Sequence, residues 1–139
     1  MNRGTLMVAA GIALGAVGMT AARHDEEHDP VRRLSVREIA EKLNGKETIA
    51  TAVEVTYEPG QAGAPHCHPG PAFGYVLEGE YEWAIDDQPA RVLKAGETFY
   101  EPGGCLHRVS RNPGKVKMRM LAWVLHPRGA KDLVIPVKQ

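Results

Sequence analysis

The sequence predicts an all-β protein, a sandwich or barrel built from short antiparallel strands. Two observations predict this class: runs in which apolar and polar residues alternate, and clusters of turn residues between those runs. The 139-residue chain has 15 glycines and 10 prolines, which suit many short strands better than a few long helices. Its length is typical of one domain, and 43% hydrophobic residues are enough for a packed core.

The charge balance argues against a nucleic acid or another polyanion as the partner. Lysine and arginine together number 17, aspartate and glutamate also 17, so the formal net charge is +0. An electrostatic polyanion binder of this size would carry a basic excess. We therefore expect no nucleic-acid partner. The same composition argues against a coiled coil or a helical bundle.

Residues 1–22 have the pattern of a signal peptide. Arg3 comes first, no charged residue occurs from Gly4 to Met19, and charge begins abruptly at Arg23. The apolar stretch is shorter than the ~20 residues of a comfortable membrane span. We expect a periplasmic or secreted protein with no stable membrane span after processing. An uncleaved N-terminal anchor is the alternative.

The mature chain is expected to begin with a leader and a helix. Residues 23–33 are polar and predict a flexible leader, followed by one domain over residues 34–139. A capping-box pattern at Ser35–Glu38 predicts a short helix over Val36–Leu43. Asn44-Gly45 would end this helix.

The strands begin after this helix. Apolar and polar residues alternate from Thr48 to Tyr57, and Pro59-Gly60 ends the run. The further expected strands are Phe73–Leu77, Tyr81–Ile85, Ala90–Leu93, Thr98–Glu101, Leu106–Arg111 and Val116–Leu125. Short strands at this spacing, separated by glycine, proline and asparagine turns, favour a sandwich or barrel.

Three histidines are the candidate metal ligands. His66 and His68 are two residues apart, so on a strand both side chains point to one face. His107 follows about forty residues later in another expected strand. Three imidazoles on strands inside a barrel can hold a divalent transition metal and leave other coordination positions open. A lone histidine, or a His-X-His pair alone, would be a weak signal.

The residues that flank these histidines resemble the two motifs of the cupin superfamily. The first motif is matched by Gly60, His66, His68 and Gly79. The second is matched by Gly96, Pro102, Gly104 and His107, with Asn112 one residue later than the pattern places it. The match runs over roughly residues 53–124. Within it, the sequence is similar to small single-domain, quercetin-dioxygenase-like cupins.

This resemblance implies a fold, a metal and an assembly. It implies a double-stranded β-helix, or jelly-roll barrel, that is commonly a homodimer. The metal would lie near the wider mouth of the barrel, held by His66, His68 and His107. Imidazole ligands suit iron, manganese, nickel, copper and zinc, so the identity of the ion stays open.

One position departs from the cupin pattern. The glutamate of the first motif would stand where this chain has Ala72, which offers no ligand atom. The motifs then supply three neutral imidazoles, or else the site is degenerate and holds no metal. Glu78, Glu97 and Glu101 lie nearby in the sequence, and strand alternation alone does not direct any of them inward.

The strand that contains Ala72 should have an inner and an outer face. If Ala72 points into the barrel, Gly74 shares that face and would leave room for a ligand, while Phe73 and Tyr75 point outward. The outward apolar stripe suits a second sheet or a partner subunit.

Two cysteines complete the candidate residues. Cys67 and Cys105 are able to form a disulfide in an oxidising compartment if their backbones lie close enough. Cys105 is either a soft ligand or a small buried hydrophobic residue.

These observations lead to two functional hypotheses and a weaker third. The first is a metal-dependent oxidoreductase, dioxygenase-like, that acts on a small enol, diketone or phenolic compound; this reaction class comes from the resemblance, and no catalytic residue is assigned. The second is a non-catalytic periplasmic module that binds a small molecule or a metal. The third is a structural dimer whose barrel is filled by side chains.

Overall fold

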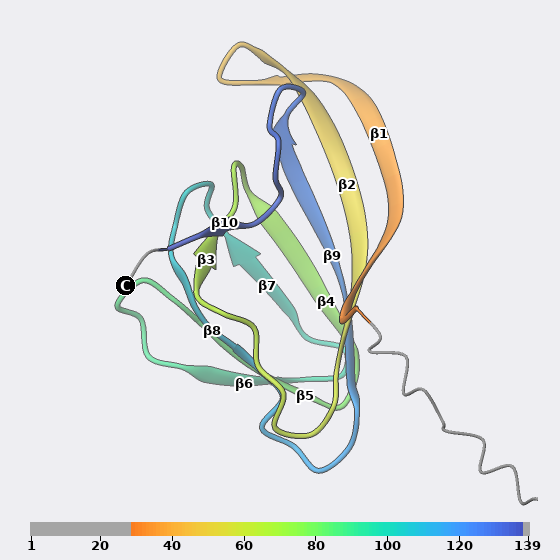
Figure 1. Cartoon of the computed structure of the whole chain (residues 1–139), viewed down its shortest axis with the longest axis vertical. Coiled ribbons are helices and arrows are strands. Elements are labelled where there is room, and N and C mark those ends of the chain that lie inside the picture. The colour runs from red at the N-terminus through yellow and green to blue at the C-terminus, as the bar shows by residue number, and fades with distance from the viewer. Residues whose placement is uncertain (1–28, 138–139) are drawn as a thin grey trace, which may run out of the picture.

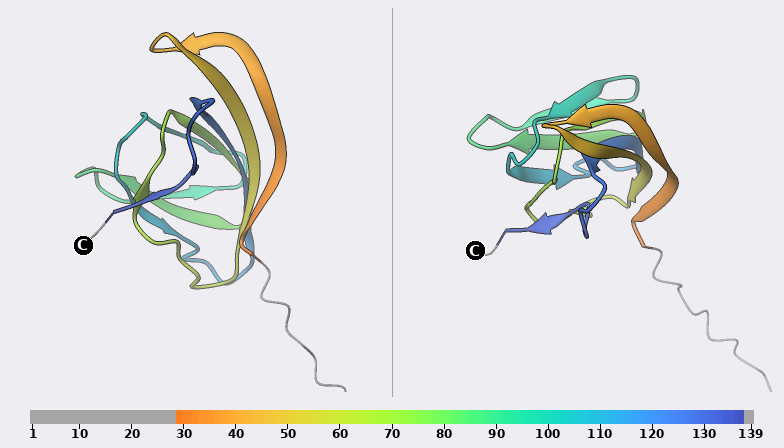
Figure 2. Two further views of the ribbon diagram at one scale, coloured as in Figure 1. Left: turned by 45° about the horizontal axis from the view of Figure 1, so that its top comes forward. Right: turned by 90° about the horizontal axis from the view of Figure 1, so that it is seen from above.

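The described part of the chain folds as two antiparallel sheets that face each other. The structure is a computed structural model, and it describes residues 29–137. The first sheet has the order β1-β2-β9-β4-β7, and the second has the order β10-β3-β8-β5-β6 (Figures 1 and 2). Residues 29–137 contain no helix, so the all-β prediction is confirmed.

The strands of the first sheet are β1 (Val31–Leu43), β2 (Lys46–Tyr57), β9 (Met118–Pro127), β4 (Ala72–Glu78) and β7 (Thr98–Glu101). The strands of the second sheet are β10 (Ile135–Pro136), β3 (His66–Cys67), β8 (His107–Arg111), β5 (Glu80–Ile85) and β6 (Arg91–Lys94). Every strand expected from the alternation pattern is therefore present, with ends that differ by a few residues.

The helix predicted over Val36–Leu43 is wrong, because this segment belongs to β1. β1 pairs with β2 along its length, and the two form a hairpin that extends beyond the rest of the barrel (Figure 1). Asn44 and Gly45 have positive φ angles of 51° and 75°, the conformation of a type I′ hairpin turn. An eight-residue helix is marginal alone, whereas pairing with β2 gives the backbone its hydrogen bonds.

Only some of the expected domain boundaries fall within the described residues. The signal peptide at residues 1–22 and most of the leader lie outside the described residues. β1 begins at Val31, so the last residues of the expected leader are part of a strand rather than flexible chain. Within residues 29–137, no helix offers the length and apolar character of a membrane span.

The core lies between the two sheets and is formed by side chains from both. Its central members include Val53, Val55, Val76, Tyr81, Trp83, Leu93, Phe99, Met118 and Met120. The expected faces of β4 are confirmed, since Ala72 and Val76 are buried, while Phe73 and Tyr75 are exposed.

Gly74 differs from its expected role. A Cβ atom at this position would lie 2.0 Å from the ring of Phe99, so the space beside Gly74 is already filled. Gly74 therefore makes room for a core aromatic ring on β7, not for a ligand.

One ion-pair network joins the three strands at the edge of the first sheet. Glu54 on β2 accepts hydrogen bonds from Arg32 Nη2 at 2.5 Å and from Arg119 Nε at 2.8 Å. These two hydrogen bonds lower the pKa of Glu54 below its ordinary value, and the bond from Arg32 has the larger effect. The network ties β1, which has only one neighbouring strand, to β2 and β9.

Candidate metal centre

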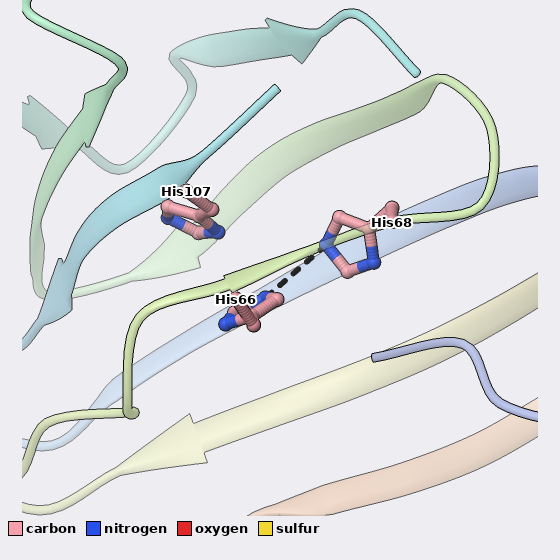
Figure 3. A group of neighbouring side chains, drawn as sticks. All are labelled: His66, His68 and His107. Carbon is pink, nitrogen blue, oxygen red and sulfur yellow. Dashed lines mark hydrogen bonds between the residues drawn. The ribbon is translucent and has the colours of Figure 1, made fainter. Parts of the chain in front are cut away.

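The fold brings the three predicted histidines together. β3 and β8 are adjacent, and His66 is the register partner of His107. His68 follows β3 directly, and its ring turns toward the other two (Figure 3). One nitrogen from each ring can be chosen so that all three lie within 4.8 Å of one another.

Backbone carbonyl groups fix which nitrogen of His66 and His68 carries hydrogen. His66 Nδ1 lies 2.8 Å from the carbonyl oxygen of Ala64, and His68 Nδ1 lies 2.6 Å from that of Leu133. A carbonyl oxygen only accepts hydrogen bonds, so each Nδ1 must donate. In a neutral ring the other nitrogen, Nε2, then carries a lone pair.

The two lone pairs point at each other. His66 Nε2 and His68 Nε2 are 3.3 Å apart, the contact drawn as a dashed line in Figure 3. Burial, followed by the charge of the neighbouring His66, lowers the pKa of His68 and so favours its neutral form. Two facing lone pairs repel unless a metal ion, or a proton shared in an N–H···N hydrogen bond, lies between them.

His107 is the most buried of the three rings. Burial, with smaller effects from His66 and His68, lowers its pKa to about 3. Its Nε2 lies 3.1 Å from the hydroxyl of Tyr81, and that hydroxyl lies 2.9 Å from Ser110 Oγ. These hydroxyl groups hold the ring in place. The sequence does not predict this role, because Tyr81 is there one aromatic residue in an apolar run.

A buried carboxylate borders the cluster, and it belongs to Glu101 at the end of β7. Glu101 Oε2 lies 3.4 Å from His68 Nε2, and Oε1 lies 3.1 Å from His107 Nδ1. Trp83 Nε1 donates a 2.9 Å hydrogen bond to Oε1. The side chain is 1% exposed, and burial raises its pKa to about 7.

The spacing of the closest two donors matches that of two ligands on one transition-metal ion. Two nitrogens bound to one ion at 2.0–2.1 Å lie about 3.4 Å apart in a tetrahedral arrangement and about 3.0 Å apart in an octahedral one. The 3.3 Å separation of His66 Nε2 and His68 Nε2 falls between these values. Among residues 29–137, the buried side-chain polar atoms without a hydrogen-bond partner are Glu101 Oε2 and His107 Nδ1, and both lie here.

The cluster opens into a cavity of about 100 Å³ inside the barrel. Its polar lining consists of the three histidines, Glu101, Tyr57 and Ser110. Its apolar lining includes Val53, Val55, Ala72, Phe99, Met120, Val124, Leu133 and Val134. An interior completely filled by side chains, the basis of the purely structural hypothesis, is therefore not what the fold shows.

The chain after β9 forms part of this cavity wall. β10 pairs with β3, placing Ile135 opposite Cys67 and Pro136 opposite His66. Leu133, just before β10, contributes both a lining side chain and the carbonyl oxygen that binds His68. No sequence pattern marks this role, because every residue has a carbonyl group.

The other candidate acids lie away from the cluster. Glu78 is exposed and lies 3.6 Å from Arg119, and Glu97 accepts a hydrogen bond from the backbone of Lys94 at the surface. Asn112, the displaced motif residue, is buried and donates to the carbonyl oxygens of Tyr57 and Val116. Its role is to fix the loop between β8 and β9.

The two cysteines are both free thiols and half-buried. Cys105 packs against the core, and burial raises its pKa to about 11. Of its two expected roles, the small hydrophobic residue is the one that this environment matches, because a soft ligand acts as the thiolate.

Comparison with known proteins gives one family match and several structural matches. A family model described as "Cupin domain" matches residues 53–124. No curated protein matches the chain.

The structural matches share the fold at low sequence identity. A double-stranded β-helix protein from Klebsiella pneumoniae is 22% identical, with a TM-score of 0.57 over 79% of this chain and 88% of its own. A Cupin 2 conserved barrel protein from Salinispora arenicola is 21% identical, with a TM-score of 0.53 over 70% and 75%. A DMSP lyase from Ruegeria pomeroyi is 20% identical, with a TM-score of 0.54 over 76% of this chain and 52% of its own.

Proposed function

Because this chain belongs to the cupin family, we propose that it is an exported metal-dependent oxidoreductase, dioxygenase-like, whose substrate is a small enol, diketone or phenolic compound. The observation that carries the proposal is the convergence of donor atoms. His66 Nε2 and His68 Nε2 face each other at 3.3 Å with their hydrogens committed to backbone carbonyls. Such a pair is stable when it shares a cation.

His66, His68 and His107 would hold the ion at the part of the cavity wall that they form. A bound divalent ion supplies Lewis acidity toward an oxygen ligand and, if it is redox-active, one-electron chemistry. The apolar walls would limit the access of water to the reacting atoms, and the hydroxyl groups of Tyr57 and Ser110, which lie 3.3 Å apart, are the polar groups that a substrate oxygen would meet in the cavity besides the cluster.

The size of the cavity limits the substrate. A volume of about 100 Å³ is below the roughly 150 Å³ of a cavity known to accept benzene. A small enol or a short diketone therefore suits the site better than a bulky polyphenol. The same small volume favours the second candidate function, a non-catalytic module that binds a metal or a very small molecule.

Elemental analysis is the first test. We expect near-stoichiometric transition metal in mature protein purified without added metal, and its loss in His66→Ala. Cys67→Ala is the matched control, because Cys67 is the next residue on β3 and contributes to a different surface hollow. Less than about a tenth of an equivalent in the parent contradicts the proposed metal centre.

A second measurement separates the enzyme from the binding module. The loaded protein is incubated with short diketones, enols and phenols while dissolved oxygen is recorded. Oxygen uptake that disappears in His68→Ala supports the enzyme. Thermal stabilisation by one of these compounds, without oxygen uptake or product, supports the binding module instead.

Export and assembly are further parts of the proposal. N-terminal sequencing of protein recovered from the periplasm or medium should begin close to residue 23. A homodimer is supported by an outer aromatic row on β7, β4 and β9: Phe73 is the register partner of both Tyr100 and Trp123, and all three are exposed. A second copy of the chain would cover this row.

A further inference from the structure

We propose that Glu101 supplies the carboxylate ligand of the metal centre, from β7, in place of the glutamate that the cupin motif puts at the position of Ala72 on β4. The site would then contain three imidazoles and one carboxylate, not three imidazoles alone. This inference rests on the proposed metal centre and adds a fourth residue to it.

Sheet register explains how the carboxylate can come from another strand. Ala72 and Glu101 are register partners in the antiparallel pair of β4 and β7. Directly opposed residues share one face of the sheet, with Cβ atoms about 4.5–5.5 Å apart. Both residues line the same cavity. A glutamate at either position can therefore reach the same region, and the small side chain of Ala72 does not compete for it.

The contacts of Glu101 leave one oxygen for a ligand. Trp83 Nε1 donates to Oε1 at 2.9 Å, which fixes the orientation of the carboxylate. The other oxygen, Oε2, is buried, has no hydrogen-bond partner and lies 3.4 Å from His68 Nε2. Because His68 Nδ1 donates to the Leu133 carbonyl group, His68 Nε2 has no hydrogen to offer this oxygen in the neutral ring.

His68 Nε2 thus has two lone-pair neighbours at short range. His66 Nε2 is 3.3 Å from His68 Nε2, and Glu101 Oε2 is 3.4 Å from it on another strand. Both separations match the distance of about 3.0–3.4 Å between neighbouring ligands of one ion with bonds near 2.0–2.1 Å. A carboxylate also removes one unit of positive charge from the buried centre, which lowers the cost of burying a divalent ion.

The alternative is a carboxylate that only positions Trp83 and His107. The two roles differ in what replaces the carboxylate. A ligand can be supplied from the neighbouring strand, whereas a positioning group cannot, because the new carboxylate of an Ala72→Glu variant would not restore the hydrogen bond from Trp83. A transplant of the carboxylate therefore separates the roles.

The experiment uses Co²⁺ as the probe, with the affinity from calorimetry and the coordination from the visible d–d spectrum. The proteins are the parent, Glu101→Gln, the transplant Ala72→Glu/Glu101→Ala, and Glu78→Gln as a control at the exposed end of β4. Glu101→Gln keeps an oxygen that can accept from Trp83, so its fold is expected to survive. Circular dichroism and thermal unfolding check each variant.

We expect Glu101→Gln to weaken Co²⁺ binding by more than about 100-fold, beyond the 10–100-fold typical of residues that only orient ligands. We also expect an altered d–d spectrum, and recovery of most of the affinity in the transplant, while Glu78→Gln equals the parent. Parent-like affinity and spectrum in Glu101→Gln overturn the inference and leave the three-histidine centre standing. A folded Glu101→Gln with weakened binding that the folded transplant does not rescue also overturns it. A parent that binds no Co²⁺ overturns the metal centre itself, and this inference with it.

Discussion

Replacing Gly74 with alanine should destabilise the barrel, although glycine in a strand is ordinarily the less favourable residue. The added Cβ would lie 2.0 Å from Phe99 Cε1 and Cζ, whereas ordinary contact begins near 3.4 Å, so the ring would have to retreat by about 1.4 Å. Two aromatic neighbours oppose this movement. Phe99 is 8% exposed, and its ring centroid lies 5.5 Å from that of Tyr81 and 6.0 Å from that of Trp83, so the space left for the ring is the cavity that it lines.

The expected loss of stability follows from two opposing effects. Inserting a methyl group into a packed core costs about 1–3 kcal/mol. Replacing glycine with alanine also reduces the conformational entropy of the unfolded chain, which stabilises the folded state by about 0.4–1 kcal/mol. The net expectation for Gly74→Ala is therefore a decrease of about 1–2 kcal/mol in the free energy of unfolding.

Urea unfolding at equilibrium measures this decrease, provided that the m-value stays unchanged. Gly129→Ala is the matched control, because a Cβ there meets no atom within 4 Å. Adding Phe99→Leu to Gly74→Ala should recover part of the stability by making the strand face less crowded. A Gly74→Ala protein as stable as the parent would refute the claim that Phe99 resists this movement.

Three further predictions concern other parts of the molecule. Glu54→Gln should lower the melting temperature at neutral pH. Because the pKa of Glu54 is lowered in the folded state, its ionised side chain stabilises the fold at pH values above the ordinary pKa of 4.5. This stabilisation is lost as the pH falls through the folded-state pKa. A difference in stability between parent and variant that persists at about pH 2 would therefore contradict the reasoning. Tyr81→Phe removes the hydroxyl next to buried His107, and urea unfolding should show a loss of about 1–3 kcal/mol; an unchanged midpoint is the contrary result. Trp123→Glu should convert a dimer to a monomer in sedimentation velocity, and a monomeric parent would refute the expected assembly.

The strand pattern was predictable because it depends on short-range alternation, and the N-terminal hairpin was not. Asn44-Gly45 both ends helices and forms type I′ turns, so its meaning depends on whether a neighbouring strand is available. Only the tertiary structure shows that β2 pairs with β1. The two-residue strands β3 and β10 are too short to show any period.

The histidines of the site were predictable, and the groups around them were only partly so. His66, His68 and His107 carry a spacing that a reader of the sequence can recognise. Glu101 has the same strand parity as buried Phe99, which is a signal for an inward side chain, but its position opposite Ala72 depends on a register that sequence does not show. The carbonyl groups of Ala64 and Leu133 have no residue-specific signal at all.

The carbonyl oxygen of Leu133 makes the orientation of one candidate ligand, His68, dependent on a part of the chain that the family match, which ends at residue 124, does not include. A truncation that removes Leu133 and β10 would leave the His68 ring free to rotate without altering any residue of the family match. Assays of metal content therefore need protein that retains this segment.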